Sequence, residues 1–105
     1  CKPVVIEEFG FPRDSVRFGR GTPTPGRDVY YARMLERVVD SKNEQGILAG
    51  CNFWGWGGEA RPEHVYWQRG DAYCGDPAQE PQGLYSVFDD DSTVGIIREA
   101  TARLQ

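Results

Sequence analysis

Two adjacent carboxylates close a short apolar run near the start of the chain. Residues 3–9, PVVIEEF, are rich in β-branched side chains and include Glu7 and Glu8. Because side chains alternate across a strand, Glu7 and Glu8 are expected to point to opposite faces. A carboxylate at the carboxyl end of a strand in a parallel barrel is a candidate catalytic group. A pair of solvated glutamates at a strand end fits the same spacing.

A second group of candidate residues is aromatic. Trp54 and Trp56 follow another apolar run in the segment CNFWGWGG, and they share a face if the strand continues that far. A flat indole at a strand end can stack on the apolar face of a sugar ring. Packing in a hydrophobic core explains a tryptophan equally well, since Trp is highly buried on average.

The segment after these tryptophans is long, rich in glycine and proline, and carries further aromatic side chains. A ligand-binding loop has this composition, and so does a loop that needs a small core of its own. The histidine among these residues is a candidate ligand contact or an ordinary surface residue. The candidates in the loop are His64, Tyr66, Trp67, Tyr73 and Tyr85.

The elements that must position these residues follow from the apolar periodicity. Residues 3–9 and 47–54 are continuous apolar runs typical of strands buried on both faces of a parallel sheet. Between them, residues 28–41 have helical spacing, preceded by Thr24 as N-cap and Pro25 as the first helical residue. Asp91 or Ser92 is expected to cap a last helix. Its apolar stripe is Val94, Ile97, Thr101 and Leu104, flanked by Ile96 and Ala100.

The resulting order, strand, helix, strand, long loop, helix, is a βαβα unit with a parallel strand pair and a right-handed crossover. Two strands and two helices cannot cover both faces of their own sheet. We therefore expect residues 1–105 to be an incomplete domain, completed by a longer chain or by another molecule. The loop over residues 55–91 is expected to lie on the face of the sheet where the strands end.

Composition and charge argue against nucleic-acid binding, a membrane span and a metal site. The chain has 105 residues and a net charge of −4, which argues against nucleic acid as a partner. No apolar run is long enough for a membrane span. The sequence has one histidine and no Cys-x-x-Cys motif, which argues against a zinc site. Residues 89–91 (DDD) lack the other ligands of a calcium-binding loop, so we interpret them as an acidic helix cap.

The three cysteines are Cys1, Cys51 and Cys74. They are too few and too scattered for a disulfide framework. A small buried hydrophobic role explains Cys51, and a bridge between Cys51 and Cys74 is the alternative.

Three longer motifs, VVIEEFGFPRD, AGCNFWGWGG and GDPAQEPQGLYSVFDDDST, closely resemble the end of bacterial β-mannanases of glycoside hydrolase family 5. The resemblance covers nearly the whole chain. It implies an α/β fold in which the chain forms the seventh and eighth units of a (β/α)₈ TIM barrel. The EFG signature is shared with cellulases of the family, whereas its combination with the other two motifs is specific to the mannanase branch.

The resemblance also implies roles for individual residues. Glu8, directly before Phe9-Gly10, corresponds to the catalytic nucleophile, and Glu7 to a structural companion. Trp54 corresponds to the floor of the subsite for the scissile sugar. The loop over residues 56–83 corresponds to a wall of the cleft, so its aromatic and histidine side chains are candidate substrate contacts: Trp56, Trp67 and His64.

The activity implied is part of a retaining endo-β-1,4-mannanase that acts on β-mannan or manno-oligosaccharide by double displacement. It needs no metal and no organic cofactor, and it operates outside the cytoplasm. The family's acid/base glutamate lies on a strand that this sequence lacks, so the isolated chain is expected to be inactive. Its partner is the remaining N-terminal barrel segment or a complementing chain. The alternatives are a β-1,4-glucanase segment of the same family and a non-catalytic carbohydrate-binding or assembly fragment.

Overall fold

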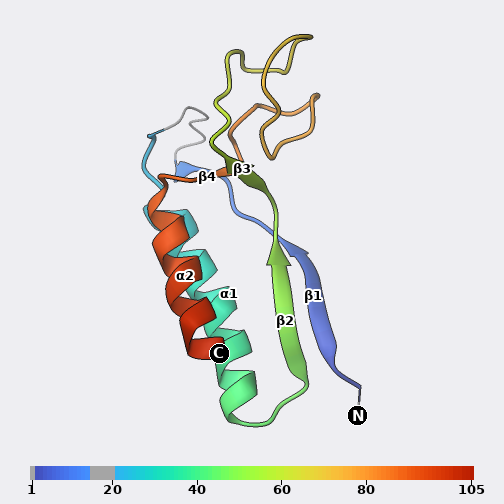
Figure 1. Cartoon of the computed structure of the whole chain (residues 1–105), viewed down its shortest axis with the longest axis vertical. Helices are drawn as coiled ribbons and strands as arrows, with labels where there is room; N and C mark the ends of the chain where they lie inside the picture. Colours follow the sequence, from blue (N-terminus) through green and yellow to red (C-terminus); the bar gives the residue numbers. More distant parts are fainter. Residues whose placement is uncertain (1, 15–20) are drawn as a thin grey trace.

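The computed structural model describes residues 2–14 and 21–105, so Cys1 and residues 15–20 lie outside the described residues. The elements follow the predicted order, with two short strands added inside the long loop. Their bounds are β1 (Val4–Phe9), α1 (Pro25–Asn43), β2 (Leu48–Phe53), β3 (Trp56–Gly58), β4 (Val87–Phe88) and α2 (Ser92–Leu104). The two helices lie side by side, and the loop between β3 and β4 extends beyond the ends of β1 and β2 (Figure 1).

β1 and β2 form the predicted parallel pair, with Ile6 opposite Cys51 and Phe9 opposite Phe53. Between these two pairs the chain advances three residues on β1 but only two on β2. The two adjacent glutamates lie within this irregular stretch. Because of it, Ile6 and Phe9 both pack into the same core. The strict alternation predicted for the strand is wrong beyond Ile6, since an extra residue re-aims the side chains that follow it.

Helix α1 begins at Pro25, as the Thr24-Pro25 pair predicted, and continues to Asn43. The Thr24 hydroxyl makes no capping bond to the helix backbone and instead contacts the side chains of Asp28 and Ser92 at 3.3 and 3.2 Å. The predicted apolar positions Tyr31 and Val38 are buried. Burial of a charged residue on the same helix, Arg27, was not predicted.

Helix α2 begins at Ser92 with Asp91 at the N-cap position, but the Asp91 side chain does not cap the helix. The predicted apolar stripe is partly wrong. Ala100 is buried, whereas Thr101 is exposed and its hydroxyl donates to the Ile97 carbonyl oxygen at 2.8 Å. Threonine satisfies its hydroxyl in this way on the solvent side of a helix.

The core lies between β1, β2 and α1. Tyr31 is fully buried, with its ring 5.0 Å from that of Phe9 and 5.7 Å from that of Phe53. The first half of β1 is open, with the adjacent residues Val4 and Val5 47% and 49% exposed. This exposure agrees with the expectation that two helices cannot cover both faces of the sheet, and burial of both faces stays a prediction for the complete domain.

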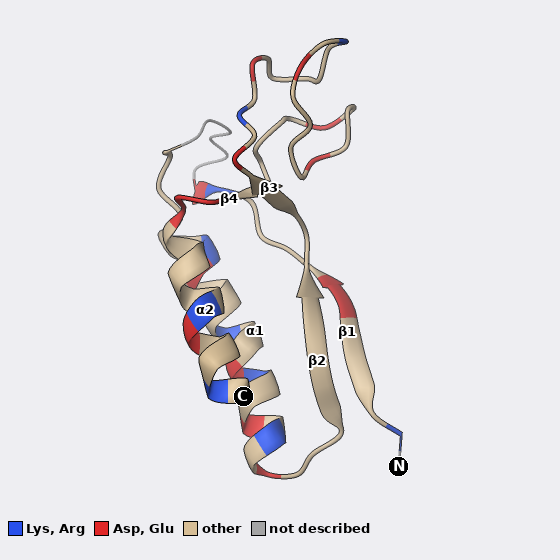
Figure 2. Ribbon diagram, viewed as in Figure 1, with Lys and Arg blue, Asp and Glu red and all other residues tan. Residues whose placement is uncertain are grey.

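The long loop is not wholly irregular. β3 pairs with β4 in parallel, with Trp56 opposite Val87, and this pair lies next to the point where β2 ends. Acidic residues mark the carboxyl end of β1 and the turn before α2, whereas β2 carries no charged residue (Figure 2). Further charged residues lie on both helices and along the long loop (Figure 2).

Candidate functional site

A cavity of about 410 Å³ lies where β1 and β2 end. Glu8 lines it, together with Trp54 from the residue after β2. Glu7 is also exposed but does not line the cavity. The other lining residues are Phe9, Gly10, Pro77, Glu80 and Tyr85. The structure thus brings together a carboxylate and an indole, the pair that the sequence placed at two neighbouring strand ends.

Backbone bonds fix the position of Trp54. The Trp54 N–H donates to the Phe9 carbonyl oxygen at 2.6 Å, and the Trp54 carbonyl oxygen accepts from the Tyr31 hydroxyl at 3.4 Å. The peptide bond between Trp54 and Gly55 is cis. A Cβ at Gly10 would lie 2.7 Å from the Trp54 carbonyl oxygen, so only glycine fits there. The indole itself is 41% exposed and remains available to a ligand.

The third wall of the cavity is a compact loop over residues 76–83, closed by two buried polar side chains. The Asp76 carboxylate accepts from the N–H groups of Gly83 and Tyr85, both at 2.8 Å, and from the Ser86 hydroxyl at 2.5 Å. The Gln82 amide donates to three carbonyl oxygens of the same loop, of which that of Pro77 is nearest at 2.8 Å. Side-chain bonds of this kind replace the regular ladder that the loop lacks.

The loop presents residues that sequence reasoning missed. Pro77, Glu80 and Tyr85 line the cavity. Tyr85 was one of the aromatic candidates in the loop, whereas Pro77 and Glu80 were not singled out. The signal available for them was the motif GDPAQEPQGLYSVF, in which all three occur. Glu80 adds a second carboxylate to the cavity that Glu8 lines.

Two predicted contacts lie in the tip of the loop rather than in the cavity. His64 Nδ1 is 2.9 Å from a carboxylate oxygen of Asp71, and Trp67 donates its indole N–H to the Asp71 carbonyl oxygen at 3.1 Å. The hydrogen bond from His64 lowers the pKa of Asp71 below its ordinary value. Trp67 stacks on Tyr73, with the ring centroids 5.2 Å apart and the planes inclined by 11°.

Trp56 is also separate from the cavity. It is 56% exposed and lines a different groove, of about 420 Å³, with apolar side chains of α1, β2 and α2. Of the five predicted site residues, the structure therefore unites Glu8 and Trp54, and it places Trp56, Trp67 and His64 elsewhere.

The comparisons with known proteins identify the family. The model of the glycoside hydrolase family 5 β-mannosidase-like proteins matches residues 1–105. The crystal structure of a family 5 mannosidase from Rhizomucor miehei is 38% identical, with a TM-score of 0.86 over 98% of this chain and 26% of that one. A glutamate-to-alanine variant of that enzyme in complex with mannosyl-fructose is 37% identical, with the same TM-score, and covers 98% of this chain and 26% of its own. No curated protein matches the chain.

The chain belongs to the glycoside hydrolase family 5 β-mannosidase-like family. Its fold is accordingly the mixed α/β fold of part of a TIM-barrel glycoside hydrolase. The chain spans about a quarter of the length of the solved structures that it matches. Those structures are fungal, so the resemblance to bacterial enzymes stays a prediction.

The structure distinguishes the two interpretations of the cysteines of this family 5 chain. Cys51 and Cys74 are both free, so the alternative of a bridge between them is wrong. Burial raises the pKa of both thiols. Among the described residues, no group of three or more histidine, cysteine or acidic side chains could hold a metal ion, and no helix is both long and apolar enough to cross a membrane.

Proposed function

We propose that the chain is part of a retaining β-mannan hydrolase in which Glu8 is the nucleophile. The observation that carries the proposal is the shared cavity of Glu8 and Trp54 at the ends of two parallel strands, in a chain that belongs to the family 5 β-mannosidase-like proteins. In a TIM barrel, residues at the carboxyl ends of the strands do the chemistry. β1 and β2 then correspond to the seventh and eighth barrel strands.

The reaction is a double displacement. A Glu8 carboxylate oxygen bonds to the anomeric carbon while the glycosidic bond breaks and a second carboxylic acid protonates the departing oxygen. Water then attacks the anomeric carbon, its proton returns to the second carboxylate, and the bond to Glu8 breaks. The two carboxyl groups must lie roughly 5–5.5 Å apart. The second one comes from a barrel strand outside these 105 residues.

The proposed substrate class rests on the exposed aromatic side chain in the cavity and on the relatives. Trp54 offers an exposed indole on which a mannosyl ring stacks, and neutral sugars require no charge complementarity. Trp67 and His64, in the tip of the loop, extend the contacts to further sugar units, whereas Trp56 lines the separate groove beside α1 and α2. Because the sequence carries the motifs of the mannanase branch, we favour internal cleavage of β-1,4-mannan over release of terminal mannose. The protein acts outside the cytoplasm, because polymeric mannan does not enter cells.

The barrel is completed by an N-terminal segment or a complementing chain. Val4 and Val5 on β1 are about half exposed, and an apolar groove of about 420 Å³ opens between β2 and the helices. Strands of a parallel sheet are stable when both faces are covered. The remaining strands and helices of a barrel cover both surfaces.

The test uses a chimaera, in which these 105 residues replace the matching quarter of the Rhizomucor miehei mannosidase. We expect it to release reducing sugar from β-mannan, with products that first appear in the β-anomeric form by NMR. Glu8→Gln should lower kcat by about 10⁴-fold or more, while the matched control Glu7→Gln stays within about tenfold of the parent. Equal activity of both variants, or products of inverted configuration, refutes Glu8 as the nucleophile.

Product lengths separate the finer alternatives. Internal cleavage of mannohexaose yields di- to tetrasaccharides from the start, whereas release of mannose alone identifies an exo-acting mannosidase. Faster hydrolysis of β-1,4-glucan than of mannan identifies the glucanase alternative. The isolated 105-residue chain should be inactive in every assay.

A non-catalytic binding or assembly fragment is the second candidate. The exposed aromatic tip of the loop favours it, because Tyr73 is 78% exposed while its ring rests on Trp67. Titration of mannohexaose against the isolated chain distinguishes the two. Binding that Tyr73→Ala abolishes, together with an inactive chimaera, favours the binding fragment over the hydrolase.

A further inference from the structure

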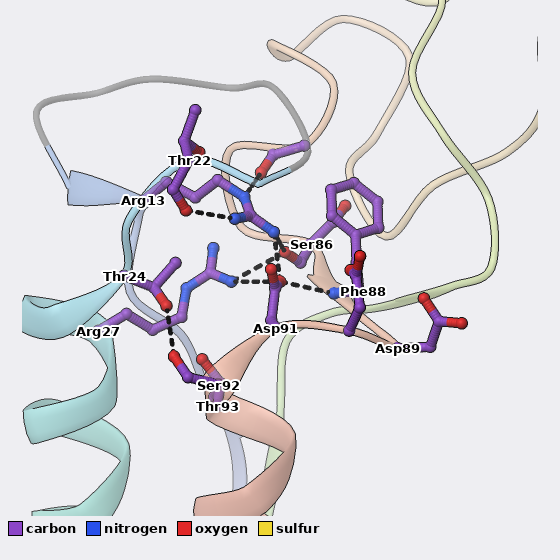
Figure 3. Close-up of polar contacts among 12 residues, drawn as sticks. Arg13, Thr22, Thr24, Arg27, Ser86, Phe88, Asp89, Asp91, Ser92 and Thr93 are labelled. Carbon is purple, nitrogen blue, oxygen red and sulfur yellow. Dashed lines mark hydrogen bonds and ion pairs between the residues drawn. The ribbon is translucent and has the colours of Figure 1, made fainter.

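Two buried arginines from different elements converge on one backbone segment (Figure 3). Arg13 follows β1 and is 1% exposed, and Arg27 lies in the first turns of α1 with no exposed surface. Both donate to the Ser86 carbonyl oxygen, at 3.2 and 2.9 Å. Arg13 also donates to the Gly83 carbonyl oxygen at 3.0 Å, and Arg27 to that of Leu84 at 2.9 Å.

The same segment is held from its other side by a buried carboxylate. Asp76 accepts from the N–H groups of Gly83 and Tyr85, while the arginines bind the carbonyl oxygens in between. The Tyr85 carbonyl oxygen accepts from the Gly55 N–H at 3.3 Å. All four carbonyl oxygens of residues 83–86 are thus bound by groups distant in sequence, and Asp76 binds two of the N–H groups, which leaves this backbone little freedom to move.

Asp91 balances the charge of the two guanidinium groups. Its carboxylate forms a buried ion pair with Arg13, lies 3.6 Å from Arg27 and accepts from the Phe88 N–H at 2.8 Å. Burial and the nearby Arg13 lower the pKa of Arg27. Buried ion pairs of this kind contribute little net stability compared with an apolar core, although removal of one partner is costly. Stability alone is therefore a weak reason for two buried arginines here.

The clamped segment is joined to the cavity through Tyr85. This residue lines the cavity with Glu8, and its Cδ1 atom lies 3.3 Å from the position of a Cβ added at Gly10, two residues after Glu8. Arg27 also donates to the Phe11 carbonyl oxygen at 3.1 Å. The Arg27 guanidinium therefore bonds both to the segment that follows Glu8 and to residues 84–86, next to the cavity-lining Tyr85.

We propose that Arg13, Arg27 and Asp91, here called the arginine clamp, are positioning residues that hold Tyr85 against the end of β1 that carries Glu8. The inference rests on the proposed function, because it assigns the clamp a role in the reaction of that site. A misplacement of about 1 Å in a catalytic cavity can cost a large factor in rate without any loss of contact to the reacting atoms.

The first experiment replaces Arg27 by lysine in the chimaera. Lysine keeps the charge, but one ammonium cannot reach the carbonyl oxygens of Phe11, Leu84 and Ser86 together. At an assay temperature well below the Tm of the variant, we expect kcat/KM for mannohexaose to fall by about tenfold or more. Val38→Ala, a buried apolar deletion on the same helix, is the control for stability, and it should leave kcat/KM within about twofold at an equal loss of Tm.

A double-mutant cycle then tests the route through Tyr85. If the clamp acts through this residue, Arg27→Lys costs no more than about twofold in a Tyr85→Ala background. Additive losses in the two backgrounds overturn the proposal. So does a fall in activity that Val38→Ala reproduces, because that result assigns the clamp to stability alone.

Hydrogen exchange gives a readout that does not depend on catalysis. Amides of residues 83–86 should exchange faster in Arg27→Lys, and remain protected in Val38→Ala and in Arg103→Lys, which alters the exposed pair with Glu36. Faster exchange with unchanged kinetics overturns the positioning role. An inactive parent chimaera overturns the proposed function itself, and the clamp is then structural only.

Discussion

Glu8 and Trp54 line the same cavity although they come from different strands. They meet because β1 and β2 run parallel and end at the same edge, where the Trp54 N–H donates to the carbonyl oxygen of Phe9. The contact between the two strand ends is thus a backbone bond beside the candidate nucleophile. Substitutions around this bond separate its structural role from its role in binding.

Replacement of Trp54 by alanine should weaken substrate binding without unfolding the chain. The backbone bonds of residue 54 survive the change, and only the exposed indole is lost. Loss of one stacked ring corresponds to about 2 kcal/mol, or roughly 30-fold in kcat/KM for mannohexaose. Steady-state kinetics of the chimaera measure it. Trp54→Phe keeps an aromatic face and should recover part of the loss, and an unchanged kcat/KM in Trp54→Ala contradicts a stacking role.

Replacement of Gly10 by alanine should damage both stability and activity. The new methyl group meets the Trp54 carbonyl oxygen at 2.7 Å and the Tyr85 ring at 3.3 Å, so the strand end must shift. We expect a cost of about 1–3 kcal/mol in the free energy of unfolding, measured by denaturant titration.

Gly95→Ala is the matched control for this change. Gly95 is an exposed helical residue with nothing within 4 Å of an added Cβ. Alanine in a helix interior is favoured over glycine by about 0.5–1 kcal/mol, so this variant should gain stability. A Gly10→Ala variant that is as stable as the parent shows that the close approach at Trp54 is not a constraint.

Alkaline pH should destabilise the chain through Tyr31. Burial raises the pKa of Tyr31 from 10.0 to about 12 in the folded state. Below pH 10 the phenol is neutral in both states and the fold keeps its full stability. Between pH 10 and about 12 the unfolded chain loses the proton first, so stability falls, by up to about 2–3 kcal/mol.

Thermal melts of the chimaera from pH 8 to 12 measure this effect. Tyr31→Phe should lose about 1 kcal/mol at neutral pH, for the hydrogen bond to the Trp54 carbonyl oxygen, and should show a smaller decline above pH 10. Identical alkaline profiles for the parent and the variant refute Tyr31 as the group responsible.

Asp71 should control the order of the loop tip. Its carboxylate accepts from the Gln68 N–H at 3.0 Å and pairs with His64, while its carbonyl oxygen holds the Trp67 indole. Because the pKa of Asp71 is lowered in the fold, its contribution is present above its ordinary value of 3.8 and is lost as pH falls through the folded value.

Asp71→Asn removes the same negative charge at pH 7, so it should disorder the loop tip as protonation of Asp71 does at low pH. The readout is the affinity of the chimaera for mannohexaose in a Glu8→Gln background, which binds without turnover. We expect weaker binding in Asp71→Asn, whereas the exposed Asp40→Asn on α1 is the control and should bind as the parent does. Equal affinity of all three shows that the tip, with Trp67 and His64, does not contact the substrate.

Local sequence patterns were sufficient for the elements and for one pair of site residues. Continuous apolar runs predicted both long strands, and helical spacing after Thr24-Pro25 predicted α1 from its first residue. Parallel strands end at one edge, so the proximity of Glu8 and Trp54 followed from the order of the elements alone. The elements depend on interactions between residues close in the chain, which is why periodicity reports them, and the pairing of Glu8 with Trp54 then follows from parallel strands that end at one edge.

Only the tertiary structure decided the rest. The irregular register around the two glutamates, the closure of residues 76–83 by Asp76 and Gln82, and the burial of Arg13 and Arg27 have no periodic signature. Arg27 and Ser86 are 59 positions apart, and nothing in either local sequence indicates that a charged side chain will be buried against that carbonyl oxygen. Such bonds form because folding removes water from polar groups that must then find partners wherever the chain brings them.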